Sequence, residues 1–219
     1  MSTENGKMKG IIFDVDGVLL DSMEIWTDLG ARYLKSIGRE PGEGLARILF
    51  SMSMEQGAEY LNDHYQLGSS SEEVMEGLRA MLRDFYFYEV KAKPGARELL
   101  KRARDAGLRI TAATSSPREH IEKALARNGL LRYIERMFTS AEVGSSKHSP
   151  EIYDAASAYM GTAADETYVF EDSLYALRTA AAAGYYTVGV FDAKGEADQE
   201  GLRESSDLYI KELKDFTTE

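Results

Sequence analysis

The segment Lys9-Gly10-Ile11-Ile12-Phe13, followed directly by Asp14-Val15-Asp16-Gly17, decides how the rest of the chain is interpreted. A short apolar run that ends abruptly in an acidic loop is typical of a buried parallel strand. Asp21 is then a predicted helix N-cap, with Glu24 three residues later in a variant of the capping box. We therefore expect one strand, an acidic loop and a helix that Gly38 ends.

The next part of the chain, up to about Val90, has the apolar spacing of helices only. Gly68-Ser69-Ser70-Ser71 predicts a loop and a helix start within it. Because no strand pattern interrupts the stretch, we expect residues 23–91 to form a compact all-helical cap domain.

After Lys93-Pro94-Gly95 the pattern changes to strands that alternate with helices. The expected strands are 108–113, 137–139, 168–170, 186–190 and 208–210, and the expected helices are 96–106, 118–128, 150–160 and 173–183. Such alternation predicts a parallel sheet covered by helices on both faces. The predicted fold class is therefore α/β: a Rossmann-like three-layer core domain of residues 1–22 and 92–219, with the cap domain inserted in it.

Composition excludes several classes of protein. The chain has 219 residues, and its 26 basic and 37 acidic residues give a net charge of −11, which disfavours nucleic acid as a partner. Without cysteine there is no disulfide, thiolate nucleophile or thiolate zinc site. The first residues lack the apolar core of a signal peptide, and no apolar run approaches the about 20 residues that span a bilayer. We expect a cytoplasmic protein that binds no membrane.

Acidic side chains follow two of the expected strands. Asp14 and Asp16 come after the first strand, and Glu171 and Asp172 end or follow the strand at 168–170. If these strands are neighbours, the carboxylates meet at one sheet edge, where like charges are costly without a cation. Oxygen ligands without histidine favour a hard cation such as Mg²⁺. A single aspartate after a strand would more simply be a turn or cap residue.

Other polar residues in the same kind of position are suited to bind an anion. Thr114 and Ser115 end one strand and precede a helix, where hydroxyls and backbone N–H groups can bind phosphate oxygens, although both residue types are also ordinary caps. Lys147 lies in a polar loop before another helix. Beside a bound cation, it would supply the positive charge that a transferring phosphoryl group needs.

Together these segments resemble the four motifs of the haloacid dehalogenase superfamily. The first motif is matched by Asp14-Val15-Asp16-Gly17-Val18-Leu19-Leu20-Asp21-Ser22 and the second by Thr114. The third is matched by Lys147-His148-Ser149-Pro150 and the fourth by Val169-Phe170-Glu171-Asp172-Ser173. Their order agrees along essentially the whole chain. The helical insert between the first and second motifs is similar to the cap of the β-phosphoglucomutase-like branch.

The resemblance implies a role for each motif residue. Asp14 would be the nucleophile that forms an aspartyl-phosphate, and Asp16 would be the general acid and then the general base. Thr114 and Lys147 would hold the phosphoryl oxygens. Mg²⁺ would be bound by the Asp14 carboxylate, the Asp16 main-chain carbonyl and Asp172, with Glu171 close by. Dehalogenases of the superfamily lack an aspartate at the position of Asp16, so the resemblance implies phosphoryl transfer.

The choice between hydrolase and mutase depends on the cap. Sugar phosphomutases of this branch carry a histidine where this chain has Trp26, a residue better suited to shape a substrate pocket or to pack the cap. They also have an arginine near Met54, and Ser51 stands where the branch commonly has glycine. We therefore expect a Mg²⁺-dependent phosphatase that acts as a monomer on a small phosphorylated metabolite such as a sugar phosphate. The alternatives are a β-phosphoglucomutase-type mutase and a non-catalytic protein that binds a phosphorylated ligand.

Overall fold

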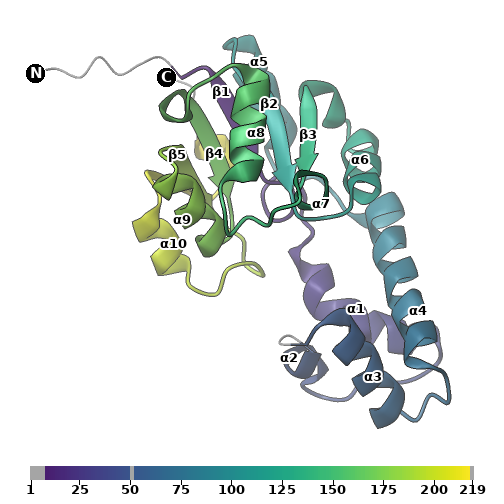
Figure 1. Ribbon diagram of the computed structural model, residues 1–219. Helices are drawn as coiled ribbons and strands as arrows, with labels where there is room; N and C mark the ends of the chain where they lie inside the picture. The colour runs from purple at the N-terminus through teal and green to yellow at the C-terminus, as the bar shows by residue number, and fades with distance from the viewer. Residues whose placement is uncertain (1–7, 50–51, 218–219) are drawn as a thin grey trace, which may run out of the picture. The chain divides into compact units, whose positions relative to one another are not determined.

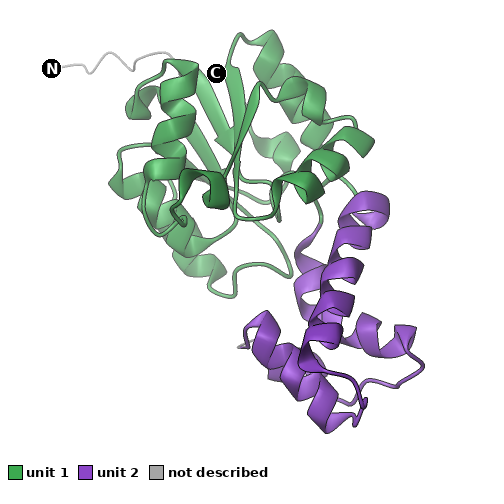
Figure 2. Ribbon diagram, turned by 45° about the vertical axis from the view of Figure 1, so that its right-hand side comes forward, with its two compact units in different colours: residues 1–21, 91–219 green, residues 22–90 purple. Residues whose placement is uncertain are grey.

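The computed structural model describes residues 8–49 and 52–217. The chain forms two compact units. One unit comprises Met1–Asp21 and Lys91–Glu219, and the other comprises Ser22–Val90 (Figure 2). The second unit is thus inserted into the first, and the chain passes between them twice. Each unit has its own apolar core.

The first unit contains a parallel sheet in the order β3-β2-β1-β4-β5-β6 (Figure 1). Its strands are β1 (Gly10–Phe13), β2 (Arg109–Thr114), β3 (Arg136–Thr139), β4 (Thr167–Glu171), β5 (Tyr186–Val190) and β6 (Leu208–Ile210). The central strand β1 is fully buried, as its apolar sequence predicts. Phe13, its last residue, is in register with Ala112 of β2 and Phe170 of β4. The carboxyl ends of these three strands therefore meet at one edge.

Helices connect successive strands. They are α5 (Ala96–Asp105), α6 (Arg118–Arg127), α7 (Ser140–Val143), α8 (Glu151–Met160), α9 (Leu174–Ala182) and α10 (Gln199–Ser205), with short turns η2 (Leu131–Tyr133), η3 (Ala164–Glu166) and η4 (Leu213–Asp215). The strand order reverses direction at β1, and right-handed crossovers then bring helices to both faces of the sheet. Helix α8 crosses in front of the sheet in Figure 1 and packs on Ile12 and Val169 through Ile152 and Tyr153.

The second unit is helical in its described residues. It contains α1 (Met23–Ser36), α2 (Leu45–Leu49), α3 (Met54–His64), α4 (Ser71–Asp84) and the π-helical turn η1 (Phe85–Glu89). Ser53 and Ser70 each begin a helix with a complete capping box. The predicted helix start in Gly68-Ser69-Ser70-Ser71 is therefore confirmed. Nowhere in the described chain is a helix long and apolar enough to cross a membrane.

Sequence patterning located the elements of the sheet unit well, but the predicted start of the first helix was wrong. The strands and the helices α5, α6, α8 and α9 match their expected ranges to within one residue at either end. Helix α1, however, has Ser22 rather than Asp21 as its N-cap, without a capping hydrogen bond from the Ser22 side chain. Asp21 is held elsewhere, because its backbone N–H donates to the carbonyl oxygen of Lys91 at 2.9 Å. The chain is therefore still paired with a neighbouring segment at residue 21.

Candidate active site

Strands β1 and β4 are neighbours, so the acidic residues that follow them lie together at the carboxyl edge of the sheet. Asp14 directly follows β1, and its backbone N–H donates to the carbonyl oxygen of Phe170 at 2.9 Å. Glu171 is the last residue of β4, and Asp172 follows it. One carboxylate oxygen each of Asp14, Glu171 and Asp172 lies within 4.8 Å of the others. The predicted convergence is confirmed for these three carboxylates, and Asp16 is not part of the group.

Lys147 lies in the middle of this acidic group. Its Nζ atom donates to Oδ1 of Asp14 at 2.5 Å and to Oε1 of Glu171 at 2.7 Å. All three side chains are at most 9% exposed, so the ion pairs are formed away from bulk water. The sequence alone would most simply place Lys147 in a solvated loop. In the structure, Lys147 is the buried counter-ion of Asp14, the candidate nucleophile.

The electrostatics of the group are unbalanced, with three carboxylates against one ammonium. Burial raises the pKa of Asp14 well above its ordinary value; Lys147 opposes that shift, and Glu171 and Asp172 add to it. Burial also raises the pKa of Asp172 to about 8, with Glu171 as the next cause. For Lys147, the attraction of Asp14 and Glu171 outweighs burial and raises the pKa above its usual value. The site thus has excess negative charge that a cation would neutralise.

Asp172 provides a structural test of whether a metal ion fits this group. Its Oδ2 atom is buried and has no hydrogen-bond partner among the described residues. A buried carboxylate oxygen without a partner costs free energy unless an ion or another group satisfies it. The oxygen donors, the excess negative charge and this unsatisfied atom all fit a hard divalent cation such as Mg²⁺.

Asp16 is held by a contact that the sequence did not reveal. Its Oδ2 atom accepts a hydrogen bond from the hydroxyl of Ser116 at 2.6 Å. Ser116 in turn donates its backbone N–H to Oγ1 of Thr114 at 3.1 Å, and Thr114 is fully buried at the end of β2. The Thr114 loop is therefore connected to Asp16 through Ser116. The exposed Ser115 points differently, since its hydroxyl contacts that of Ser140 at 3.2 Å.

Tyr153 is a second site residue that sequence reasoning missed. It lies on α8, is fully buried, and donates its hydroxyl to Oε1 of Glu171 at 2.8 Å. Its position among the regularly spaced apolar residues of α8 predicts only a core residue. Ser116 could have been found because it lies in the same loop as Thr114, whereas nothing in the sequence distinguishes the hydroxyl of Tyr153 from those of the other tyrosines.

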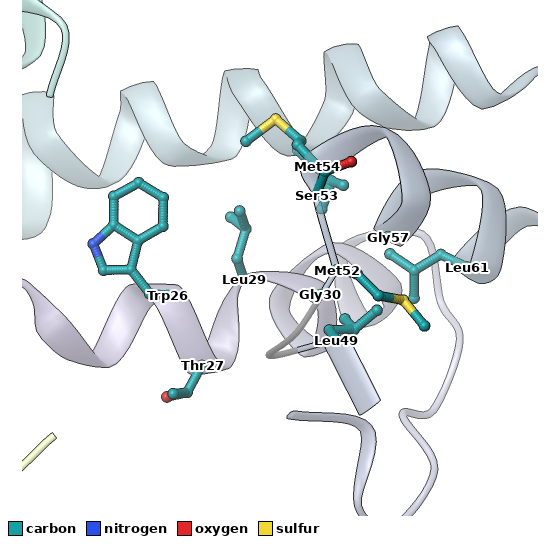
Figure 3. A pocket seen from close by; sticks show the side chains of 11 residues that line it. Trp26, Thr27, Leu29, Gly30, Leu49, Met52, Ser53, Met54, Gly57 and Leu61 are labelled. Carbon is teal, nitrogen blue, oxygen red and sulfur yellow. The ribbon is translucent and has the colours of Figure 1, made fainter. Parts of the chain in front are cut away.

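Trp26 lies in the helical unit, where it lines an apolar pocket of about 160 Å³ (Figure 3). The indole is 45% exposed and projects from α1 on the same side as Leu29. Met52 and Met54 contribute to the same lining. Trp26 is therefore not a buried packing residue. The remaining cap departure, Ser51, lies outside the described residues.

Comparisons with known proteins agree with this fold. A model of the haloacid dehalogenase-like hydrolase family matches residues 8–184. A phosphorylated carbohydrates phosphatase of Thermotoga maritima is 27% identical over 177 residues, which cover 81% of this chain and 82% of that protein. The validoxylamine A 7'-phosphate phosphatase of Streptomyces hygroscopicus subsp. limoneus is 27% identical over 207 residues, 94% of each chain.

A solved structure of high similarity comes from Thermotoga maritima and is provisionally named a beta-phosphoglucomutase. It superposes with a TM-score of 0.83 at 27% identity and covers 93% of this chain and 94% of that one. The family match spans most of the chain and includes all the acidic and basic side chains of the site described above, from Asp14 to Asp172. The chain belongs to the haloacid dehalogenase-like hydrolase family.

Proposed function

We propose that this protein is a Mg²⁺-dependent phosphatase that hydrolyses a small phosphate monoester through an aspartyl-phosphate on Asp14. The observation that carries the proposal is the buried group at the end of β1 and β4, in which Lys147 contacts Asp14 while Oδ2 of Asp172 is unsatisfied. Such a group has a nucleophile, a fixed positive charge and donors for a cation. These are the components that phosphoryl transfer requires.

In the first step, a carboxylate oxygen of Asp14 attacks phosphorus, and the bond between phosphorus and the ester oxygen breaks. The departing alkoxide takes a proton from the Asp16 carboxyl group, so that the product leaves as a neutral alcohol. Ser116 keeps Asp16 oriented for this transfer through its 2.6 Å hydrogen bond. Lys147 stabilises the charge on the phosphoryl oxygens, and the hydroxyl of Thr114 and the loop of Ser115 provide further donors.

In the second step, the Asp16 carboxylate takes a proton from a water molecule. The resulting hydroxide oxygen bonds to phosphorus, the bond between phosphorus and Asp14 breaks, and inorganic phosphate is released. Asp14 and Asp16 then have their original protonation states. Two easier displacements replace one difficult hydrolysis, which is the advantage of a covalent intermediate.

Mg²⁺ would be held by the Asp14 carboxylate, the main-chain carbonyl of Asp16 and Asp172, with Glu171 adjoining. When bound, the ion neutralises charge on the phosphoryl group and on the attacking carboxylate. Without it, the negative charges of Asp14 and the substrate repel each other, and Lys147 opposes that repulsion.

For the substrate, we propose a phosphorylated sugar or similar metabolite, because two similar phosphatases are named for phosphorylated carbohydrates and for a validoxylamine phosphate. Trp26 would be a substrate-binding residue, since its exposed indole lines an apolar pocket. A β-phosphoglucomutase activity is the second candidate, and it is supported by the provisional name of the similar Thermotoga maritima structure.

The test is release of inorganic phosphate from a panel of sugar and other small phosphates, with Mg²⁺ or with chelator. β-Glucose 1-phosphate belongs in the panel, and glucose 6-phosphate is assayed in the same reactions. We expect phosphate release that requires Mg²⁺ and is lost in Asp14→Asn. The matched control is Asp105→Asn, which changes an exposed aspartate paired with Lys101. Glucose 6-phosphate formation without phosphate release would instead establish a mutase.

A further inference from the structure

Lys93 makes an unusual set of contacts for a residue that the function described above does not use. It follows the second passage of the chain between the two units, and its side chain is only 14% exposed. Its Nζ atom donates to the carbonyl oxygen of Gly17 at 2.6 Å, to that of Phe191 at 2.9 Å and to Oδ2 of Asp192 at 2.8 Å. The three N–H donors of the ammonium thus have one acceptor each.

The first of these contacts reaches the loop that carries the acid/base residue. Gly17 directly follows Asp16 and has a φ of +74°, so the chain turns sharply there. Its backbone N–H donates to Leu20, and the backbone N–H of Lys93 donates to Leu19 at 2.9 Å. Main chain and side chain of Lys93 therefore both attach to the loop between β1 and α1.

The other two contacts reach the loop that follows β5. Phe191 and Asp192 begin this loop, and Gly195 lies three residues further on. A Cβ atom on Gly195 would lie 2.9 Å from Oδ2 of Asp172 and 3.1 Å from Cβ of Asp192. The loop therefore closely approaches the unsatisfied carboxylate oxygen of the active site. Lys93 connects this loop to the Asp16 loop, although it lies 76 positions from Gly17 and 98 positions from Phe191 in the sequence.

We infer that Lys93 is a positioning residue, which holds the backbone beside Asp16 so that its carboxyl group faces the leaving oxygen. This inference rests on the proposed function. The Nζ atom of Lys93 donates to the carbonyl oxygens of Gly17 and Phe191 and to Asp192, so its effect on Asp16 passes through the two loops that it joins. If the Lys93 side chain is replaced, the Gly17 and Phe191 carbonyls and Asp192 lose a common donor. The Asp16 loop then loses its link to the loop after β5 and keeps only the main-chain bond from residue 93 to Leu19.

A misplaced general acid has a specific kinetic consequence. A substrate with an alkoxide leaving group needs a proton from Asp16, whereas p-nitrophenyl phosphate releases a phenolate that needs none. The value of kcat/KM reports the reaction up to the first departure of the leaving group, so it is unaffected by the later hydrolysis of the intermediate. Comparing kcat/KM for the two substrates therefore isolates the general-acid step.

The experiment measures kcat/KM of Lys93→Met for p-nitrophenyl phosphate and for the alkyl phosphate that the wild-type enzyme hydrolyses fastest. We expect a fall of about 10²-fold for the alkyl phosphate, as for loss of a general acid, and a much smaller change for p-nitrophenyl phosphate. Asp192→Asn weakens the same attachment and should show the same selectivity to a lesser degree. It also keeps the test available if Lys93→Met does not fold.

The matched control is Arg109→Met. Arg109 pairs with Glu135 and donates to the carbonyl oxygen of Met160 at the opposite end of the strands, so the change also removes a cation that joins separate segments. We expect it to leave the ratio of the two kcat/KM values unchanged. Equal losses for both substrates in Lys93→Met, or no loss for either, would overturn the inference. Failure of the proposed function would be seen separately, as absence of turnover in the wild-type enzyme.

Discussion

Lys147 Nζ and Asp14 Oδ1 lie 2.5 Å apart, although 133 positions separate the two residues in the sequence. Both side chains are buried, so the attraction between them is little screened by solvent. The parallel sheet produces this proximity, because Asp14 follows β1 at the carboxyl edge of the sheet and the loop before α8 lies at the same edge. One lysine thus stabilises the charged nucleophile and is in place to bind the phosphoryl group.

Replacing Lys147 by methionine should therefore impair catalysis and stability together. We expect kcat/KM to fall by about 10²–10³-fold, because a preorganised positive charge is lost from the transition state. We expect the free energy of unfolding to fall by about 3–5 kcal/mol without metal, because Asp14 and Glu171 lose their buried counter-ion. Urea unfolding and steady-state kinetics check both. Lys101→Met, which removes an exposed and solvent-screened ion pair, should leave the free energy of unfolding almost unchanged. A fully active Lys147→Met variant would contradict the role.

Asp172 makes the stability of the metal-free protein depend on pH. Its pKa is raised from 3.8 to about 8, so between these values the folded protein keeps a proton that the unfolded chain has released. The contribution of Asp172 to the free energy of unfolding therefore decreases as pH rises through this window. At pH about 8 in chelator, Asp172→Asn should be more stable than wild type by about 1–3 kcal/mol.

Binding of Mg²⁺ to Asp172 should stabilise the folded protein, and this stabilisation should increase as pH rises. We expect Mg²⁺ to raise the melting temperature of wild type, more at pH 8 than at pH 5, because binding requires the ionised carboxylate. Asp172→Asn should lose most of this gain and need more Mg²⁺ for half-maximal activity. Thermal melts with and without Mg²⁺ measure the effect. An unchanged Mg²⁺ requirement in Asp172→Asn would rule out the ligand role.

Tyr153→Phe removes one hydroxyl and leaves the ring packing in place. Because that hydroxyl orients Glu171, we expect the Mg²⁺ concentration for half-maximal activity to rise by about 10-fold. Tyr185→Phe is the control: Tyr185 is buried in the same core, but its hydroxyl donates to Asp154 instead. A similar effect in both variants would indicate a general packing defect rather than orientation of Glu171.

The sequence predicted the parts of the fold and site that depend on local patterns. The buried strand before Asp14, the alternation after Pro94 and the acidic pair at Glu171 and Asp172 each lie within a few residues of chain. The parallel arrangement of strands then determines that the strand ends meet at one edge. That reasoning located the carboxylates without any knowledge of distances.

Contacts between distant segments could not be predicted in this way. Tyr153 and Ser116 act through single hydroxyl groups whose partners lie 18 and 100 positions away. The three acceptors of Lys93 come from loops that only the folded sheet brings together. The N-cap predicted for α1 was wrong for the same reason. The backbone N–H of Asp21 donates to the carbonyl oxygen of Lys91, which lies 70 positions later in the chain.

Detection of a phosphoryl group on Asp14 tests the central claim most directly. Asp16→Asn, which should slow hydrolysis of the intermediate, is mixed with p-nitrophenyl phosphate and Mg²⁺, quenched in acid and analysed by peptide mass spectrometry. We predict a phosphoryl adduct on the peptide that contains Asp14, and none when Asp14→Asn is added. Phosphate release by wild type without any adduct in Asp16→Asn, or an adduct on another residue, would contradict the account.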